Sequence, residues 1–378
     1  MLRRTTFARV QLCFWLLASC WAAAPASAPP ASARAPVPAE KFALPIVELH
    51  GTPAEMGASH GKQLAKPIDV LREKYLKVFL GGAAKRFVAM AAARSFEKQI
   101  LPEHLAEINA LARQTGMSPE EAVLAQCFLD LTPMQACSTI ALPATASPDH
   151  VARLGRNLDF PALNIADKYT TLIIYRPDDG RYKFAAVAWP GMIGVLSGIN
   201  EHGLALANME VTRGARVPDA MPYTLLYRML LERCKMVDEA IALLKKTPRQ
   251  TPNNLMLMDA AGNRAVVEIT PAAITVRRGI DGAALISTNH QRGQDADTAG
   301  RCVRYDYLHD TAKKDFGSVE EKTIEQMLAG ASQADFTLQS MVFEPANRVI
   351  YLSAGKNAAR GEFHRLDLKP FFAEVLGH

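Results

Sequence analysis

The residue pattern of this chain changes once, near Cys137, and that change limits the folds open to it. Before Cys137, apolar residues recur at helical spacing, as in 53–79, 87–100 and 102–112. After it, short apolar segments alternate with Gly, Asp and Asn turns, which predicts strands. Strands grouped with strands and helices with helices indicate an α+β fold rather than repeated βαβ units. We therefore expect two antiparallel sheets with helices outside, after a mainly helical segment.

Two local signals place helix ends before the change. Ser118-Pro119-Glu120-Glu121 predicts a helix start, with Ser118 as N-cap and Glu121 completing a capping box. Gly116 is expected to close the preceding helix in a left-handed conformation. The helix that begins at Ser118 is predicted to run to about Leu131.

The first 28 residues predict a secretion signal. Three arginines precede an apolar run, 10–24, which is too short for a membrane span, and Ala26-Ser27-Ala28 offers a small-residue cleavage site. Leu17-Ala18-Ser19-Cys20 also resembles a bacterial lipoprotein box, in which the signal ends at about residue 19 and Cys20 carries the lipid. Residues 29–43, rich in Pro and Ala, predict a flexible linker. Either signal places the mature protein outside the cytoplasm, as a periplasmic, secreted or lipid-anchored protein.

Charge and cysteine content exclude several classes of protein. Removing residues 1–28, with three arginines and no acids, lowers the formal net charge from +5 to +2. No basic run then suggests nucleic acid, and no later apolar run is long enough for a membrane span. The four remaining cysteines are too few for a disulfide scaffold and have no CxxC spacing for zinc. We expect no cofactor or metal, and a small-molecule substrate; the oligomeric state is open.

Cys137 heads a predicted strand, and Arg156 and Asp159 follow on what reads as the adjacent strand. A thiol becomes a good nucleophile when a neighbouring charge or base assists it. If the chain is cut between Ala136 and Cys137, the new α-amine can accept the thiol proton, because its pKa is about 8. A buried structural cysteine beside an ordinary salt bridge is the plain alternative for the three residues.

Several motifs in order carry a resemblance to a known family. They are Leu49-His50-Gly51-Thr52-Pro53-Ala54-Glu55-Met56-Gly57, Gly155-Arg156-Asn157-Leu158-Asp159-Phe160, Asn200-Glu201-His202-Gly203-Leu204, Ser287-Thr288-Asn289-His290, Arg301-Cys302-Val303-Arg304-Tyr305 and Ser340-Met341-Val342-Phe343-Glu344-Pro345. Together they resemble the acyl-CoA:6-aminopenicillanic acid acyltransferase family of autoproteolytic N-terminal-nucleophile hydrolases, related to choloylglycine hydrolases and acid ceramidase. The resemblance implies an αββα sandwich and self-cleavage before Cys137. A small chain or prosegment, 44–136, and a catalytic large chain, 137–378, are then expected to stay associated.

The resemblance also implies roles for single residues. They are Cys137 as nucleophile, Arg156 as the group that tunes it, Asp159 as the partner of its amine, Asn200 and Asn289 as the oxyanion hole, and Arg301 as a further site residue. Asn200 is expected to act partly through its backbone N–H, and Arg304 competes with Arg301. Read without the family, Asn200 is a turn residue and Asn289 a strand cap.

Gly57-Ala58-Ser59-His60-Gly61 satisfies the G-x-S-x-G pattern and would alone suggest a serine esterase with Ser59 as nucleophile. A nucleophile elbow needs a central strand before it, and only one short strand precedes Ser59 in the mature chain. The small residues fit better on a helix face packed closely against a neighbour. A second alternative is an inactive binding protein of the same fold.

The sequence therefore predicts a zymogen that cuts itself before Cys137 and then acts on an N-acyl amide through a thioester acyl-enzyme. Hydrolysis and acyl transfer differ only in the final acceptor, so both stay open.

Overall fold

The computed structural model describes residues 44–132, 136–212, 214, 220–293 and 301–373. The predicted signal peptide, the linker 29–43 and the alternative lipid site at Cys20 lie outside these residues and stay predictions.

The larger sheet has eight strands, and the segment before Cys137 supplies one of them. β1 (Ile46–Gly51) pairs in parallel with β4 (Thr171–Pro177) at one edge. The other strands are antiparallel and follow β4 in chain order: β5 (Phe184–Ala188), β6 (Ser197–Asn200), β7 (Ala205–Glu210), β8 (Asn253–Met258), β9 (Arg264–Ile269) and β10 (Ile274–Arg278). The prediction of antiparallel sheets is wrong at this edge. The chain between β1 and β4 passes through the helices before Cys137 and two strands of the other sheet, and so long a connection allows two strands to run in the same direction.

The smaller sheet has six antiparallel strands in the order β11-β2-β3-β12-β13-β14. Their bounds are β2 (Ala136–Leu142), β3 (Arg153–Asp159), β11 (Leu285–Ser287), β12 (Thr337–Glu344), β13 (Val349–Ala354) and β14 (His364–Asp367). In the β2–β3 register, Ala136 lies opposite Asp159 and Cys137 opposite Leu158. The predicted adjacency of the two strands is confirmed, and it brings the start of β2 beside the end of β3.

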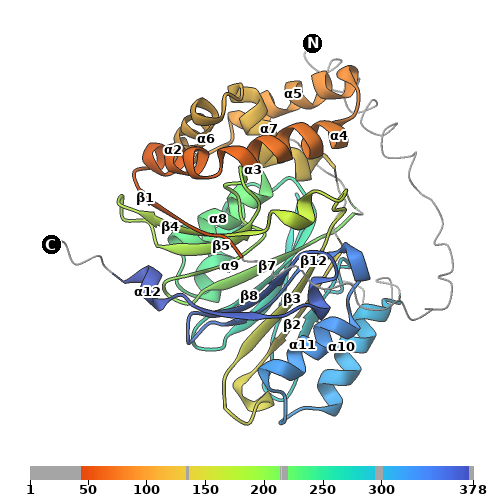
Figure 1. Cartoon of the computed structure of the whole chain (residues 1–378). Helices are drawn as coiled ribbons and strands as arrows, with labels where there is room; N and C mark the ends of the chain where they lie inside the picture. Colours follow the sequence, from red (N-terminus) through yellow and green to blue (C-terminus); the bar gives the residue numbers. More distant parts are fainter. Residues whose placement is uncertain (1–43, 133–135, 213, 215–219, 294–300, 374–378) are drawn as a thin grey trace. The chain divides into compact units, whose positions relative to one another are not determined.

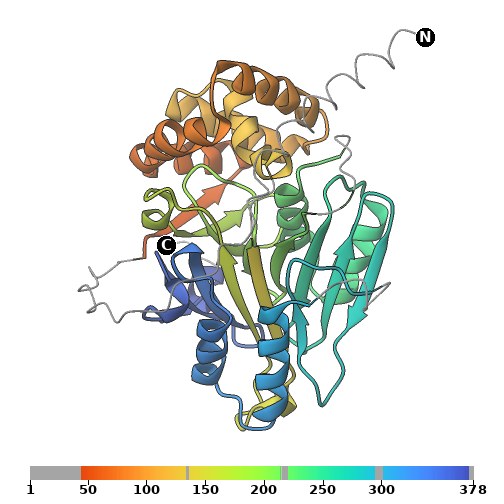
Figure 2. The ribbon, with the colours of Figure 1, turned by 90° about the vertical axis from the view of Figure 1, so that its right-hand side faces the viewer.

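Helices cover the outer faces of both sheets (Figures 1 and 2). α8 (Tyr223–Arg233) and α9 (Val237–Lys246) pack on the larger sheet, and α10 (Val303–Lys314) and α11 (Glu321–Gly330) on the smaller. A Cβ at Gly198 would lie 2.9 Å from Leu231 of α8, and one at Gly155 2.7 Å from Ile324 of α11. Both helix layers thus depend on close approach to a strand, and the predicted αββα sandwich is confirmed.

Buried apolar residues lie in two layers. The larger cluster contains Leu158 and Met341 of the smaller sheet together with Met256 of the larger sheet. The smaller cluster joins Ile140 of β2 to Ile324 and other residues of α10 and α11. Because side chains alternate along a strand, the face of β3 opposite Gly155 is the one turned toward the larger sheet.

The remaining helices gather in the segment before Cys137, drawn in orange in Figure 1. They are α2 (Pro53–Gln63), α3 (Ala65–Val70), a π-helical turn (Leu71–Leu76), α4 (Lys77–Leu80), α5 (Ala83–Glu97), α6 (Pro102–Thr115) and α7 (Pro119–Leu131). The chain also has 3₁₀ turns at Ala144–Ala146, Ala166–Lys168, Ala334–Phe336 and Ala358–Arg360, and a short α12 (Lys369–Phe372).

Helix ends before Cys137 follow the local signals, with one exception. Ser118 and Glu121 form the predicted capping box, and Gly116 closes α6 with φ of 66°. The single helix predicted over 53–79 is wrong, because it is interrupted at Leu64. Pro67 explains the interruption, since its ring clashes with the carbonyl four residues earlier and it has no N–H to donate.

The G-x-S-x-G segment lies inside α2 and packs against α6. A Cβ at Gly57 would lie 2.1 Å from the carbonyl oxygen of Glu107, and one at Gly61 2.7 Å from the side chain of Gln114. Ser59 accepts a hydrogen bond from Gln63 one turn later, at 2.8 Å. A serine within a regular helix is not on the sharp strand-to-helix turn of a nucleophile elbow. The esterase alternative is therefore wrong, and the close-packing interpretation is confirmed.

Candidate active site

Cys137 is the second residue of β2, is fully buried, and has three of its groups held by different side chains. Its Sγ lies 3.5 Å from Nη2 of Arg156. Its backbone N–H donates to Oδ1 of Asn289 at 2.8 Å, and its carbonyl oxygen accepts from Nη1 of Arg304 at 2.5 Å. The thiol, the amide and the carbonyl of one residue are thus fixed in a single polar site.

Arg156 reaches the thiol from β3 and is fully buried. Nη1 donates to the backbone carbonyl of Leu196 and to Oγ of Ser197 at the start of β6, and Nη2 donates to Oδ1 of Asn208 at 3.3 Å. Burial lowers the pKa of Arg156, and the neighbouring Cys137 and Asp159 oppose that shift. The guanidinium therefore links the two sheets and points one edge at the sulfur.

Asp159 lies beside Ala136, the residue before Cys137, and its carboxylate is buried. Oδ1 accepts from Oγ1 of Thr337 at 2.6 Å, and Oδ2 accepts from Nε2 of Gln333 at 3.2 Å and pairs with Arg304 at 3.5 Å. Burial raises the pKa of Asp159, although Thr337, Arg304 and Gln333 lower it in part. The site thus holds a buried carboxyl group next to the bond that the sequence predicts to be cut.

The Cys137 thiol of the uncut chain ionises less readily than an exposed thiol. Burial raises the pKa of Cys137; Arg156 opposes this rise, and the charge of Asp159 adds to it. All four cysteines of the described chain, Cys127, Cys137, Cys234 and Cys302, are free thiols. Cys137 is therefore available as a nucleophile, with a cation beside it that favours the thiolate.

Asn289 lies at Cys137, and Asn200 does not. Oδ1 of Asn289 accepts from the Cys137 N–H and its Nδ2 donates to the carbonyl of Glu210 at 2.8 Å, so its part in an oxyanion hole stays a prediction. The two amide hydrogens of Asn200 bond the carbonyls of Leu231 and Cys234 in and after α8, at 2.9 and 2.7 Å. Its Oδ1 accepts from the N–H groups of His202 and Leu204, and its own N–H bonds the carbonyl of Leu204 at 3.0 Å. With both amide hydrogens and the backbone N–H engaged, Asn200 has no donor left for an oxyanion. The predicted role of Asn200 in an oxyanion hole is therefore corrected. Asn200 is a turn residue.

Asn208, which the sequence analysis missed, is the better candidate for that role. Its Oδ1 accepts from Arg156, while its Nδ2 is buried and has no hydrogen-bond partner among the residues that the structure describes. A buried amide donor without a partner costs free energy unless a ligand or water uses it. The sequence signal for Asn208 is weak: it is a polar residue within a strand that is mostly apolar.

The arginine in the site is Arg304, three residues after the predicted Arg301. The side chain of Arg301 is 91% exposed, and its ion pair is with Asp306 at 3.7 Å. Arg304, in the first turn of α10, bonds the carbonyl of Cys137 and also donates to Oδ1 of Asn289 at 3.0 Å. The start of α10 therefore does supply an arginine to the site. That arginine is Arg304, the alternative to Arg301.

An apolar cavity of about 80 Å³ lies close to this site. Phe160, the residue after Asp159, and Leu196, whose carbonyl binds Arg156, form part of its wall. Tyr75 and Phe128, from the helices before Cys137, and Trp189 complete much of the lining. The cavity thus has walls on both sides of the predicted cut.

Two kinds of feature are absent from the described residues. No group of three or more His, Cys, Asp or Glu side chains there is arranged to hold a metal ion. In the same residues, no helix has both the length and the hydropathy of a membrane span.

Comparisons with solved structures give low similarity. An N-acylethanolamine-hydrolyzing acid amidase ortholog from Caenorhabditis elegans has a TM-score of 0.46 and 17% identity, over 56% of this chain and 93% of the other. A variant of the conjugated bile acid hydrolase from Clostridium perfringens has 0.45 and 13%, over 62% and 93%. Penicillin V acylase from Agrobacterium tumefaciens has 0.42 and 14%, over 61% and 86%. Similarity at this level does not transfer an activity.

Sequence relatives are also distant. Proteins dcd1A and dcd1B of Dictyostelium discoideum are each 24% identical, over 52% and 54% of this chain and 51% and 46% of their own length. The chain thus spans about half the length of these curated relatives.

Residues 146–359 match the family described as acyl-coenzyme A:6-aminopenicillanic acid acyl-transferase. The match begins nine residues after Cys137 and includes Arg156, Asp159, Asn208 and Asn289. Because it covers more than half of the 378 residues, the chain belongs to the acyl-coenzyme A:6-aminopenicillanic acid acyl-transferase family.

Proposed function

We propose that this protein cuts its own chain between Ala136 and Cys137, and that the freed Cys137 then cleaves or transfers the acyl group of an N-acyl amide. The observation that carries the proposal is the set of contacts around Cys137. One guanidinium lies at its sulfur, one amide oxygen holds its N–H, and a second guanidinium holds its carbonyl. A structural cysteine needs none of these contacts.

In the self-cleavage step, Sγ of Cys137 attacks the carbonyl carbon of Ala136. The thiol proton ends on the departing nitrogen, the C–N bond breaks, and a thioester joins Ala136 to Sγ. Water then hydrolyses the thioester, which gives the carboxylate of Ala136, the free thiol and the α-amine of Cys137. Nδ2 of Asn208 is a donor available for the oxyanion.

In the turnover step, the same thiol attacks the acyl carbonyl of the substrate. The α-amine of Cys137 accepts the thiol proton and passes it to the leaving amine, so one residue supplies nucleophile and base. Oδ1 of Asn289 already accepts from the nitrogen that becomes this amine, and Asp159 adds a nearby negative charge. Water or a second amine then takes the acyl group from sulfur.

The apolar cavity supports an apolar acyl group. Its lining is almost wholly hydrocarbon and aromatic, with Phe160 and Trp189 beside each other at a centroid distance of 5.9 Å. Burying a CH₂ group in such surroundings is worth about 0.8 kcal/mol. We therefore expect turnover to rise with acyl length until the cavity is full.

The extracytoplasmic location also stays a proposal, since it rests on residues 1–43.

The test is N-terminal sequencing of the purified protein followed by assays on N-acyl amides of graded acyl length. We expect a large fragment beginning at Cys137 and release of free amine. Cys137→Ala should remain one chain and lose amide cleavage, whereas Ser59→Ala should be cut and active. A wild-type chain that stays whole, or an active Cys137→Ala protein, would overturn the proposal.

A further inference from the structure

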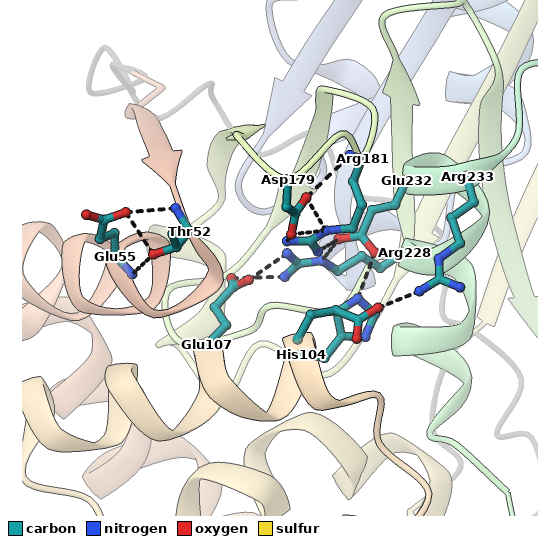
Figure 3. A network of polar contacts seen from close by, with 10 residues as sticks. Thr52, Glu55, His104, Glu107, Asp179, Arg181, Arg228, Glu232 and Arg233 are labelled. Carbon is teal, nitrogen blue, oxygen red and sulfur yellow. Dashed lines mark hydrogen bonds and ion pairs between the residues drawn. The ribbon is translucent and has the colours of Figure 1, made fainter.

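A buried cluster of charged side chains lies outside the candidate site, between the two segments that the cut would separate. Figure 3 shows α6, from the segment before Cys137, facing α8 across this cluster. His104 and Glu107 come from α6, and Arg228 and Glu232 from α8. All four side chains are fully buried.

The contacts in this cluster pair the two segments closely. Arg228 binds both oxygens of Glu107, at 2.9 and 2.6 Å, and donates through Nε to Glu232 at 2.8 Å. Oε2 of Glu232 lies 2.7 Å from Nε2 of His104, and its Oε1 accepts from Arg181 at 2.6 Å. The guanidinium of Arg228 also lies over the rings of Tyr175 and Phe184, at 4.5 and 5.4 Å.

We propose that Arg228 and Glu232, with Arg181 bound to Glu232 from behind, form a charged docking site that holds helix α6 of the cut small chain, 44–136, on the large chain. This inference rests on the proposed cut before Cys137. A two-pronged guanidinium–carboxylate contact has a single geometry, so it fixes the position of α6 as well as binding it. Removing one partner leaves the buried charges of the cluster out of balance, which speeds dissociation.

Uncharged contacts also cross the cut, so the cluster acts together with them. β1 pairs with β4, Gln126 of α7 bonds the backbone of Gly191 and Ile193, and His60 of α2 accepts from the N–H of Gly191. Some of them adjoin the cluster: the N–H of Ile193 bonds Gln126 while its carbonyl accepts from Arg228, and Tyr175, which lies under Arg228, belongs to β4. The ion cluster is the part that a single charge change can open without altering side-chain size.

The chain offers a matched control on the same helix. Glu103 is one turn before Glu107 on α6, and it pairs with Arg233, five residues after Arg228. That pair crosses between the same two segments, but its side chains are 22% and 43% exposed. An exposed ion pair contributes little because water and salt screen it. Glu103→Gln therefore removes the same charge from the same helix outside the buried cluster.

The experiment measures release of the small chain from the processed enzyme by size exclusion after dilution, with denaturing electrophoresis of the fractions. We expect Glu107→Gln and Arg228→Met to release it at least tenfold faster than wild type, and Glu103→Gln to match wild type. Release at the wild-type rate from Glu107→Gln, or equally fast release from Glu103→Gln, would overturn the docking site. The double variant Glu107→Gln/Arg228→Gln should release more slowly than the faster single variant, because neither charge is then left alone; strictly additive effects would count against the pair.

A parallel set in the uncut Cys137→Ala chain shows that each variant folds. The same chain, given a protease site in 133–135 and nicked there, tests the docking site without self-cleavage. A wild-type chain that never cuts itself would thus contradict the proposed function. The nicked chain would still test the docking site, by the same comparison of Glu107→Gln with Glu103→Gln.

Discussion

Arg156 and Arg228 are both fully buried, yet their surroundings are opposite. Arg228 has two carboxylates as partners, and Glu107 and Glu232 raise its pKa despite burial. Arg156 donates to a carbonyl, a hydroxyl, an amide oxygen and a thiol. Burial lowers its pKa, and its Nε has no hydrogen-bond partner within the described ranges. No carboxylate in the described part of the chain forms an ion pair with Arg156. The charge of Arg228 is thus balanced by carboxylates, whereas the charge of Arg156 is available to a group that becomes negative beside it.

The difference teaches how to tell structural from chemical charges inside one protein. A buried cation that is matched by buried anions stabilises one packing and needs nothing more. A buried cation that faces neutral groups is costly until a thiolate or an oxyanion forms beside it. The predictions below test this contrast, beginning with the largest expected effect.

The sharpest test exchanges each arginine for methionine in the uncut Cys137→Ala chain. Arg228→Met should lower the free energy of unfolding by about 3–5 kcal/mol, because Glu107 loses its counter-ion and Glu232 loses one of its two arginine partners. Arg156→Met should lower it by less, since Thr337, Gln333 and Arg304 still hold the carboxylate of Asp159. Urea unfolding followed by circular dichroism measures both. Equal losses would remove the distinction between the two sites.

The reverse order is expected for activity. In the chain with Cys137 intact, Arg156→Met should slow self-cleavage and amide turnover about 10²–10³-fold, the usual effect of losing one electrostatic contact to a reacting group. Alkylation of Cys137 by iodoacetamide should slow as well, because the thiolate loses its nearest cation. A fully active Arg156→Met enzyme would show that the uncancelled charge has no chemical role.

Arg304 and Arg301 provide the next comparison. Arg304→Lys should lose about 1.5–3 kcal/mol of its charged hydrogen bonds, because a lysine cannot span the carbonyl of Cys137 and Oδ1 of Asn289 together. Cleavage rates should fall about tenfold to a hundredfold. Arg301→Lys, on an exposed side chain, should change them by less than about twofold. Time courses of the cut on denaturing gels measure both variants, and a stronger effect at Arg301 would restore the first assignment.

The last comparison concerns the dependence of stability on pH. Burial, together with the charge of Arg228, lowers the pKa of His60 to about 3, so the folded chain keeps this ring neutral. Its contribution to stability is complete above the unfolded pKa of about 6.5 and is lost as the pH falls toward 3, at about 1.4 kcal/mol per pH unit. His60→Gln retains an acceptor for Gly191 and should show a shallower loss between pH 6.5 and 4 in urea titrations. Parallel curves for the two proteins would contradict this.

Much of the fold could be predicted because its signals are local. The capping box at Ser118 and the change of pattern at Cys137 depend on neighbouring residues alone. β14 was missed because four mostly exposed residues carry no apolar alternation. The break in the first long helix was visible in Pro67, and it was overlooked because the apolar spacing continues past it.

The site was harder, because its members meet across two sheets. Cys137, Arg156, Asp159 and Asn289 were found through spacing and resemblance, and the structure brings them together. Asn200 failed because of the two-residue period of a strand: Ser197 reaches Arg156, so a residue three positions later faces the opposite side, toward α8. Asn208 needed the pairing of β6 with β7 to be known, which one sequence does not reveal.

The position of Ala136 has a further consequence. New chain ends usually fray, because nothing orders the first residues of a segment. Here the ladder to β3 already includes Ala136 and Cys137, so hydrolysis would create an end that is rigid from the moment it exists. The new α-amine of Cys137 would then already be in position, and no rearrangement of the chain would have to follow the cut.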